Sequence, residues 1–165
     1  MAISMLIAAA LQAALPQPPG VLELLNDEWV CLESLRGGPI WRSETWQRDG
    51  QGRLTGIVQT RRSTAGPPEV RQEAELAISG SGRGMRLTYR ADGRTTRYRL
   101  VRNDHMEAVF ELIGSGSPRI ISYRNGSGFR QLEVMHGLAN GSSRRWIYQL
   151  RGLHMAPGNC DGTRR

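Results

Sequence analysis

Apolar and polar residues alternate along most of the chain from Trp29 onward. Met85, Leu87 and Tyr89 fall on one face of such a segment, and Arg, Glu, Gln or Thr fill most positions between apolar residues. The same alternation recurs at Tyr98 and Leu100; at Met106, Ala108, Phe110 and Leu112; at Leu132 and Val134; and at Trp146, Tyr148 and Leu150. A period of two is that of a β-strand with one buried face. The pattern therefore predicts a chain built from half-buried strands.

Short segments rich in Gly, Asn and Asp separate these strands, and no convincing amphipathic helix follows residue 28. The segments lie at 49–52, 79–82, 91–93, 102–104, 114–117, 125–128 and 138–141. Hairpin turns need positive φ at one or two positions, which these residue types tolerate. Strands joined by hairpins form an antiparallel meander, and closure removes its long free edges. We predict an all-β protein with one meander closed into an up-and-down barrel of about 8–10 strands at 24–153; the alternative is a sandwich.

The N-terminal segment reads as an export signal. The first twenty residues carry no charge, and 5–15 form an apolar run that is too short to span a bilayer. We predict a signal peptide at 1–14, an extended segment at 15–23 that leads into the barrel, and a C-terminal tail at 154–165. The alternative is a short N-terminal helix packed on the domain. Export places the protein in the periplasm or outside the cell.

The chain has two cysteines, Cys31 at the start of the barrel and Cys160 in the tail. A bridge between them would pin the tail to the barrel, as an oxidising compartment allows. Two cysteines are also compatible with two unpaired thiols. We predict the disulfide.

The basic charge does not by itself indicate a nucleic-acid partner. The net charge is +7 and all 22 basic residues are arginine. They are spread through nearly every strand; Arg86, Arg90, Arg97 and Arg99, for example, alternate with apolar residues. Nucleic-acid proteins more often show a basic stripe with aromatic stacking platforms. We therefore interpret the arginines as solvated outer faces, and we expect neither a nucleic-acid partner nor a stable membrane span.

No segment carries the signature of a reaction centre. The Gly-Ser-Gly-Ser stretch 114–117 lies between two apolar strands, and the glycine-rich stretch 79–84 does not lead into a helix, as a phosphate-binding loop would. Both are predicted to be hairpin turns. The histidines, His105, His136 and His154, are too far apart for a metal site and read as surface or rim residues. We assign no catalytic residue, no metal and no cofactor.

Several short motifs resemble an uncharacterised family of exported bacterial domains with a lipocalin-like barrel. The family's apolar stretch ending in Trp is matched by Trp29, its Glu-x-Trp by Glu44 and Trp46, and its Gly-to-Thr turn by Gly56 and Thr60. The most specific stretch of the family reads Phe-Glu-Asn-Pro-Glu-His-Asp-Phe-Pro-Gln-Arg-Ile-x-Tyr. In register with that stretch are Phe110, Glu111, Pro118, Ile121 and Tyr123. The resemblance covers most of residues 24–152 and implies a calycin-type barrel.

The chain departs from the family where the family is most polar. Ser115, Gly116 and Ser117 replace the family's His-Asp-Phe, while Ile120 and Gln59 replace two arginines. The residues that match are those that would fix strands, and the polar cluster is lost. The resemblance therefore implies a divergent member and a fold, and it assigns no activity.

A barrel of this kind suggests a non-catalytic binding module for a small apolar or amphipathic ligand. The candidate ligand-binding residues are Glu44, Trp46, Tyr89, Tyr98, Phe110, Tyr123, Trp146 and Tyr148. Aromatic residues in alternation can equally be core packing. Two other functions stay open: a barrel cyclase, isomerase or hydrolase using Glu44 or Glu111 as acid or base, and an envelope protein-interaction module using the arginine-rich outer strands.

Overall fold

The computed structural model describes residues 20–35, 38–62, 67–126, 130–152 and 160 of the 165-residue chain. These form ten strands, a short helix and a 3₁₀ turn. The helix is α1 (Val21–Leu24) and the turn is η1 (Gly82–Gly84). The strands are β1 (Glu28–Leu35), β2 (Gly38–Arg48), β3 (Leu54–Arg62), β4 (Glu69–Ser79), β5 (Arg86–Ala91), β6 (Arg94–Asn103), β7 (Glu107–Leu112), β8 (Ile120–Asn125), β9 (Gln131–Gly137) and β10 (Ser143–Leu150).

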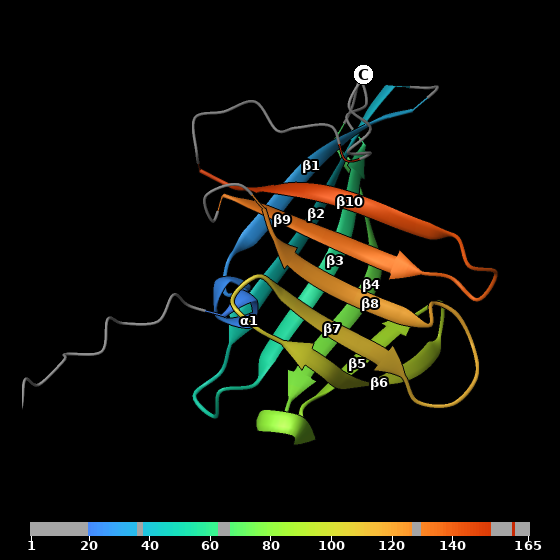
Figure 1. The fold of residues 1–165 in the computed structure, drawn as a ribbon. Coiled ribbons are helices and arrows are strands. Elements are labelled where there is room, and N and C mark those ends of the chain that lie inside the picture. The colour runs from blue at the N-terminus through green and yellow to red at the C-terminus, as the bar shows by residue number, and fades with distance from the viewer. Residues whose placement is uncertain (1–19, 36–37, 63–66, 127–129, 153–159, 161–165) are drawn as a thin grey trace, which may run out of the picture.

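The strands form one closed antiparallel barrel in the order β1-β10-β9-β8-β7-β6-β5-β4-β3-β2 (Figure 1). Each strand pairs with its neighbours in sequence, and β10 closes the barrel on β1. The predicted all-β meander barrel is confirmed. Among the described residues every strand thus has a partner strand on both sides, although β1 and β10 pair at only two positions, Trp29 with Leu150 and Val30 with Gln149.

Three local features differ from the sequence-based expectation. The extended segment predicted at 15–23 instead ends in α1, whose Val21 and Leu22 are buried because the helix packs on the barrel. Residues 1–19, which include the predicted signal peptide, lie outside the described residues. The predicted hairpin at 79–84 contains η1. Met106, which the alternation predicts to share the buried face of Ala108 and Phe110, precedes the first residue of β7 and is 44% exposed.

A disulfide closes the junction between the first and last strands. The predicted bond between Cys31 and Cys160 is present, with Cα atoms 5.1 Å apart. The Cys160 N–H donates to the Leu32 carbonyl (3.1 Å), and the Cys160 carbonyl accepts from the Ile147 N–H (3.0 Å). Residue 160 therefore extends the backbone hydrogen bonding between β1 and β10 and anchors the tail there.

Large side chains fill the middle of the barrel. Six aromatic residues have essentially no accessible surface: Trp29, Trp46, Tyr98, Phe110, Tyr123 and Tyr148. A side chain without accessible surface has no water-sized space beside it. Gly56 shows how tight the packing is, since a Cβ at this position would lie 2.8 Å from the Trp46 ring on the neighbouring strand. The middle of the barrel is thus a packed core.

Candidate functional site

All eight predicted ligand-binding residues belong to the barrel's inner face, but they divide into two groups. Six are buried in the packed middle: Glu44, Trp46, Tyr98, Phe110, Tyr123 and Tyr148. Trp146, which is 9% exposed, and the half-buried Tyr89 lie nearer to solvent. Only the second group can touch a ligand without rearrangement of the core. The candidate site is therefore smaller than the sequence predicts.

Glu44 is the only charged side chain among the described residues that is buried, at 2% exposure. Trp46 Nε1 donates to Glu44 Oε1 (2.8 Å), and the Tyr123 hydroxyl is also hydrogen-bonded to this carboxylate. The Trp46 and Tyr123 rings meet edge to face at 5.8 Å. Burial raises the pKa of Glu44 from 4.5 to about 6, against the opposing effects of Trp46, Arg42 and Tyr123. Glu44 thus ties β2 to β8 inside the barrel.

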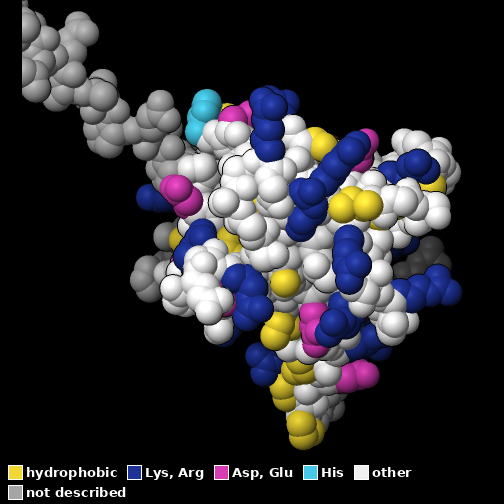
Figure 2. Space-filling model, turned by 90° about the horizontal axis from the view of Figure 1, so that it is seen from below, with side chains coloured by type: hydrophobic (Ala, Val, Ile, Leu, Met, Phe, Trp, Pro, Cys, Tyr) yellow, Lys and Arg dark blue, Asp and Glu magenta, His cyan; other side chains and the backbone are white. Residues whose placement is uncertain are grey.

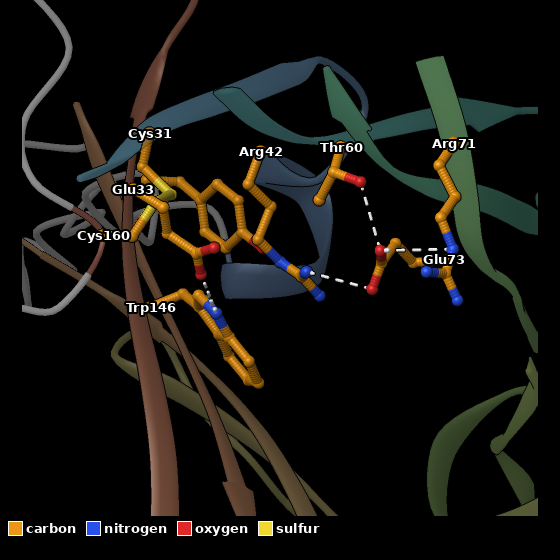
Figure 3. A network of polar contacts seen from close by, with 9 residues as sticks. Cys31, Glu33, Arg42, Thr60, Arg71, Glu73, Trp146 and Cys160 are labelled. Carbon is orange, nitrogen blue, oxygen red and sulfur yellow. Dashed lines mark hydrogen bonds and ion pairs between the residues drawn. A yellow bond between two sulfur atoms is a disulfide. The ribbon is translucent and has the colours of Figure 1, made fainter. Parts of the chain in front are cut away.

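Arg42 lies two residues before Glu44 on the same inward face of β2. Its side chain is only 11% exposed. The guanidinium lies over the Trp146 ring, 4.8 Å from the ring centroid, and its Nε donates to the Tyr148 hydroxyl (2.9 Å). Figure 3 shows the guanidinium reaching away from β2, with Trp146 on one side and Glu73 on the other. A cation over an indole face is stabilised by the ring quadrupole, so Trp146 and Tyr148 hold Arg42 in place.

A row of aromatic rings continues from Arg42 across the inside of the barrel. The centroid of the His136 ring lies 4.8 Å from that of Trp146 and 5.8 Å from that of Tyr89, and both pairs of rings are edge to face. Because Tyr89 is on β5 and His136 on β9, this contact spans the barrel interior. Burial, together with the charges of Arg42 and Arg144, lowers the pKa of His136 from 6.5 to about 4. His136 is therefore neutral at pH 7.

Two carboxylates complete this region. The register shift between Val58 and Gln59 leaves Glu73 without a partner on β3, and this bulge carries Glu73 into contact with Arg42. Glu73 Oε2 is 3.6 Å from Arg42 Nη1, and Glu73 Oε1 accepts from the Thr60 hydroxyl (3.1 Å). On the other side Glu33 accepts from Trp146 Nε1 (3.3 Å), with the disulfide beside it (Figure 3).

We call this region the polar end. Its residues lie on the inner face and contact one another at the end of the barrel opposite α1: Glu33, Arg42, Thr60, Glu73, Tyr89, His136 and Trp146. Within the described residues no group of three or more His, Cys, Asp or Glu could hold a metal ion. The polar end combines one nearly buried cation, a neutral imidazole, two aromatic surfaces and two hydrogen-bonded acids.

Sequence reasoning missed the charged half of the polar end. Arg42 and His136 each continue an alternating face, Arg42 with Glu44 and Trp46, and His136 with Val134. The alternation therefore carries a signal for both residues, and for Arg42 it is obscured because arginine occurs in nearly every strand. Of the histidines predicted to be surface or rim residues, His105 is exposed, and His136 is partly exposed with its ring turned into the end of the barrel against Trp146. His154 lies outside the described residues.

The Gly-Ser-Gly-Ser stretch is the connection between β7 and β8, which pair directly. Gly114 and Gly116 have φ of +100° and +140°, so both glycines adopt the left-handed conformations expected of a turn. Ser115 and Ser117 are exposed. The Tyr98 hydroxyl donates to the Pro118 carbonyl (3.1 Å), which fastens the loop to the core. The hairpin prediction is confirmed.

Several outward-facing arginines pair with acids on neighbouring strands. Arg90 pairs with Glu75 (3.1 Å) and Arg99 with Glu111 (2.6 Å). Figure 2 shows arginine side chains scattered over one face of the molecule, with acidic and other side chains between them. This face has no continuous basic stripe, in keeping with the interpretation of the arginines as solvated outer positions.

Comparison with known proteins adds no assignment. No family model, no curated protein and no solved structure matches the chain. In the part of the chain that the structure describes, none of the helices has the length and apolar character needed to cross a membrane. The resemblance to lipocalin-like domains stays a prediction, and the evidence for function is the geometry of the polar end.

Proposed function

We propose that this protein is an exported, non-catalytic binding protein for a small amphipathic molecule, and that the ligand binds at the polar end. The observation that carries the proposal is the contrast in exposure along the inner face. The middle of the barrel is filled, whereas Arg42, Tyr89, His136 and Trp146 keep partial contact with solvent. Binding sites combine apolar and aromatic walls with a few fixed polar groups, which is the composition of this region.

The polar groups of the site are held before any ligand arrives. Trp146 is positioned by Glu33 and Arg42, and Arg42 by Tyr148. Because these side chains already have fixed partners, little conformational entropy is lost when a ligand contacts them. Such preorganisation favours binding of a defined small molecule.

Catalysis has weaker support. A catalytic acid or base must reach the substrate. Glu44 has a raised pKa but is 2% exposed and is hydrogen-bonded to Trp46 and Tyr123. Glu111 faces outward and pairs with Arg99. Neither carboxylate considered from the sequence is placed to act on a molecule at the polar end.

Export is supported by the disulfide. Disulfides persist in oxidising compartments such as the periplasm and the extracellular space. The bond between Cys31 and Cys160 has both sulfur-bearing residues fully buried, beside Glu33 of the polar end (Figure 3). A lipocalin-like family membership, as the motifs suggest, is part of the same proposal.

The test uses the neutral fluorescent probe N-phenyl-1-naphthylamine and two tryptophan variants. Trp146→Ala removes an aromatic wall of the site, and Trp41→Ala removes the 37% exposed tryptophan of β2 as a matched control. We expect the probe to bind the native protein, Trp146→Ala to weaken binding by about tenfold or more, and Trp41→Ala to leave it unchanged. Native mass spectrometry of protein isolated from the periplasm should also show a retained small molecule. Absence of probe binding, or equal loss in both variants, would contradict the proposal.

A further inference from the structure

The Arg42 guanidinium has unused hydrogen-bond donors. Arginine carries five N–H groups. Among the described residues, Nε–H has a hydrogen-bond acceptor in Tyr148, while Nη1 stands 3.6 Å from Glu73, beyond hydrogen-bond length. No nitrogen of Arg42 is both buried and unpaired, so the nitrogens of the remaining N–H groups keep some accessible surface. A nearly buried guanidinium therefore presents its fork to the polar end.

The surroundings of His136 show where positive potential is concentrated. Two arginines, Arg42 and Arg144, act on the imidazole, and no carboxylate is among the groups that shift it. Arg144 is directly opposite His136 in the β9–β10 pairing. The space between His136, Trp146 and Arg42 is thus bordered by two cations and a neutral ring.

The acids of this region already have donors of their own. Glu33 accepts from Trp146, and Glu44 accepts from Trp46 within the packed middle. Glu73 accepts from Thr60 and has a second cation, Arg71, at 3.9 Å. Glu73 would therefore keep two partners if another anion took the free donors of Arg42. A cationic ligand would instead have to compete for carboxylates that are already hydrogen-bonded.

We propose that the ligand at the polar end carries a carboxylate, and that the free Nη1 and Nη2 donors of Arg42 bind it. This inference rests on the proposed function and adds the charge and type of the head group. A guanidinium matches a carboxylate in a two-point hydrogen bond, which is stronger and more directional than a single contact. Trp146 beneath the guanidinium and Tyr148 at Nε fix its orientation. The apolar part of the ligand would lie on Tyr89 and Trp146.

The experiment compares three probes that share one alkyl chain: decanoic acid, decanol and decylamine. Each is measured at pH 8 by its displacement of N-phenyl-1-naphthylamine from the native protein, from Arg42→Gln and from Arg97→Gln. Arg97 is an exposed arginine of β6 and serves as the charge-matched control. We expect the native protein and Arg97→Gln to bind decanoic acid about tenfold or more tightly than decanol, and Arg42→Gln to bind the two about equally.

The outcomes separate the two proposals. If no probe binds the native protein, the proposed binding function fails together with the inference. If decanol binds as tightly as decanoic acid, or decylamine binds best, the binding function stands and the carboxylate inference is overturned. If Arg42→Gln does not fold, the inference is decided by whether the native protein binds decanoic acid more tightly than decanol. An equal loss of preference in Arg97→Gln would show that overall charge, and not Arg42, is responsible.

Discussion

The barrel has two contrasting ends. At the helix end, Val21 and Leu22 of α1 and the following Leu25 are buried in the core, and the neighbouring inner positions are apolar: Trp29, Leu54, Ile78 and Ala108. At the polar end the same alternating strands place Glu33, Arg42, Glu73 and His136 inside. One repeating strand pattern therefore builds a core at one end and a cluster of charges and rings at the other.

The contrast shows how stability and binding are distributed in this molecule. Burial of apolar surface contributes about 25 cal/mol per Å², so the helix end and the middle carry most of the hydrophobic stabilisation. At the polar end the buried charges must be compensated by partners, as Arg42 is by Tyr148, Trp146 and Glu73. Where buried charges are stabilised by polar partners rather than by dense packing, a ligand can replace one of those partners.

The largest expected effect comes from removing a side chain of the packed middle. Phe110 is fully buried and meets Tyr123 edge to face at 6.4 Å. Phe110→Ala leaves a cavity and should lower the free energy of unfolding by about 3–5 kcal/mol, measured by urea denaturation. Tyr89→Ala at the polar end is the matched aromatic truncation. Because Tyr89 is half-buried, we expect less than half of that loss; equal losses would erase the distinction between the two regions.

The helix end, the middle and the disulfide illustrate what the sequence could predict. Strand alternation and turn residues are local signals, so they were sufficient for the meander and for the inward positions of Trp46, Tyr98 and Phe110. The pairing of Cys31 with Cys160 followed from there being one pair of cysteines. The meander and the inward positions follow from the period of apolar residues, and the disulfide follows from the number of cysteines. Neither requires knowledge of which strands face each other across the barrel.

The polar end depends on contacts that a strand pattern does not encode. Glu73 reaches Arg42 through a bulge in the β3–β4 pairing, and a bulge reverses the inward and outward assignment of the residues after it. The contact of Tyr89 with His136 crosses the interior between strands that do not pair. The sequence therefore predicted aromatic residues that line the barrel and missed the charges that make one end different.

A second prediction concerns Glu44, which lies between the two regions. Its pKa is about 6 in the folded protein and 4.5 ordinarily. The folded state thus holds the proton more tightly, so this stabilisation is fully present below pH 4.5 and is lost as the pH rises through 6. The difference corresponds to about 2 kcal/mol. Glu44→Gln mimics the protonated carboxyl, and its stability relative to the native protein should increase by about 2 kcal/mol between pH 4.5 and pH 7.

His136 supplies the opposite slope and must be kept constant in that comparison. Its pKa is lowered from 6.5 to about 4, so the stabilisation is present above pH 6.5 and is lost as the pH falls toward 4. Both proteins in the pair retain His136, and its effect cancels in the difference. Urea denaturation of the two proteins at pH 4.5 and pH 7 measures that difference. A value that stays constant with pH would show that Glu44 is not desolvated in the folded state.

The smallest expected effect is at the loop between β7 and β8, which belongs to neither the core nor the polar end. Ser115→Ala and Ser117→Ala each remove an exposed hydroxyl from a turn whose shape depends on Gly114 and Gly116. Each should change the free energy of unfolding by less than about 0.5 kcal/mol, as exposed substitutions usually do.

The same variants should bind N-phenyl-1-naphthylamine as the native protein does, because the loop is attached to the barrel through the Tyr98 hydroxyl and the Pro118 carbonyl, and the serine hydroxyls have no part in that bond. Tyr98→Phe is the informative control, since it removes this attachment while leaving both serines in place. If Tyr98→Phe lowers stability and the serine variants do not, the loop is a turn fastened by Tyr98. A serine variant that folds normally and loses probe binding would instead make the loop part of the site and extend the polar end beyond the barrel's inner face.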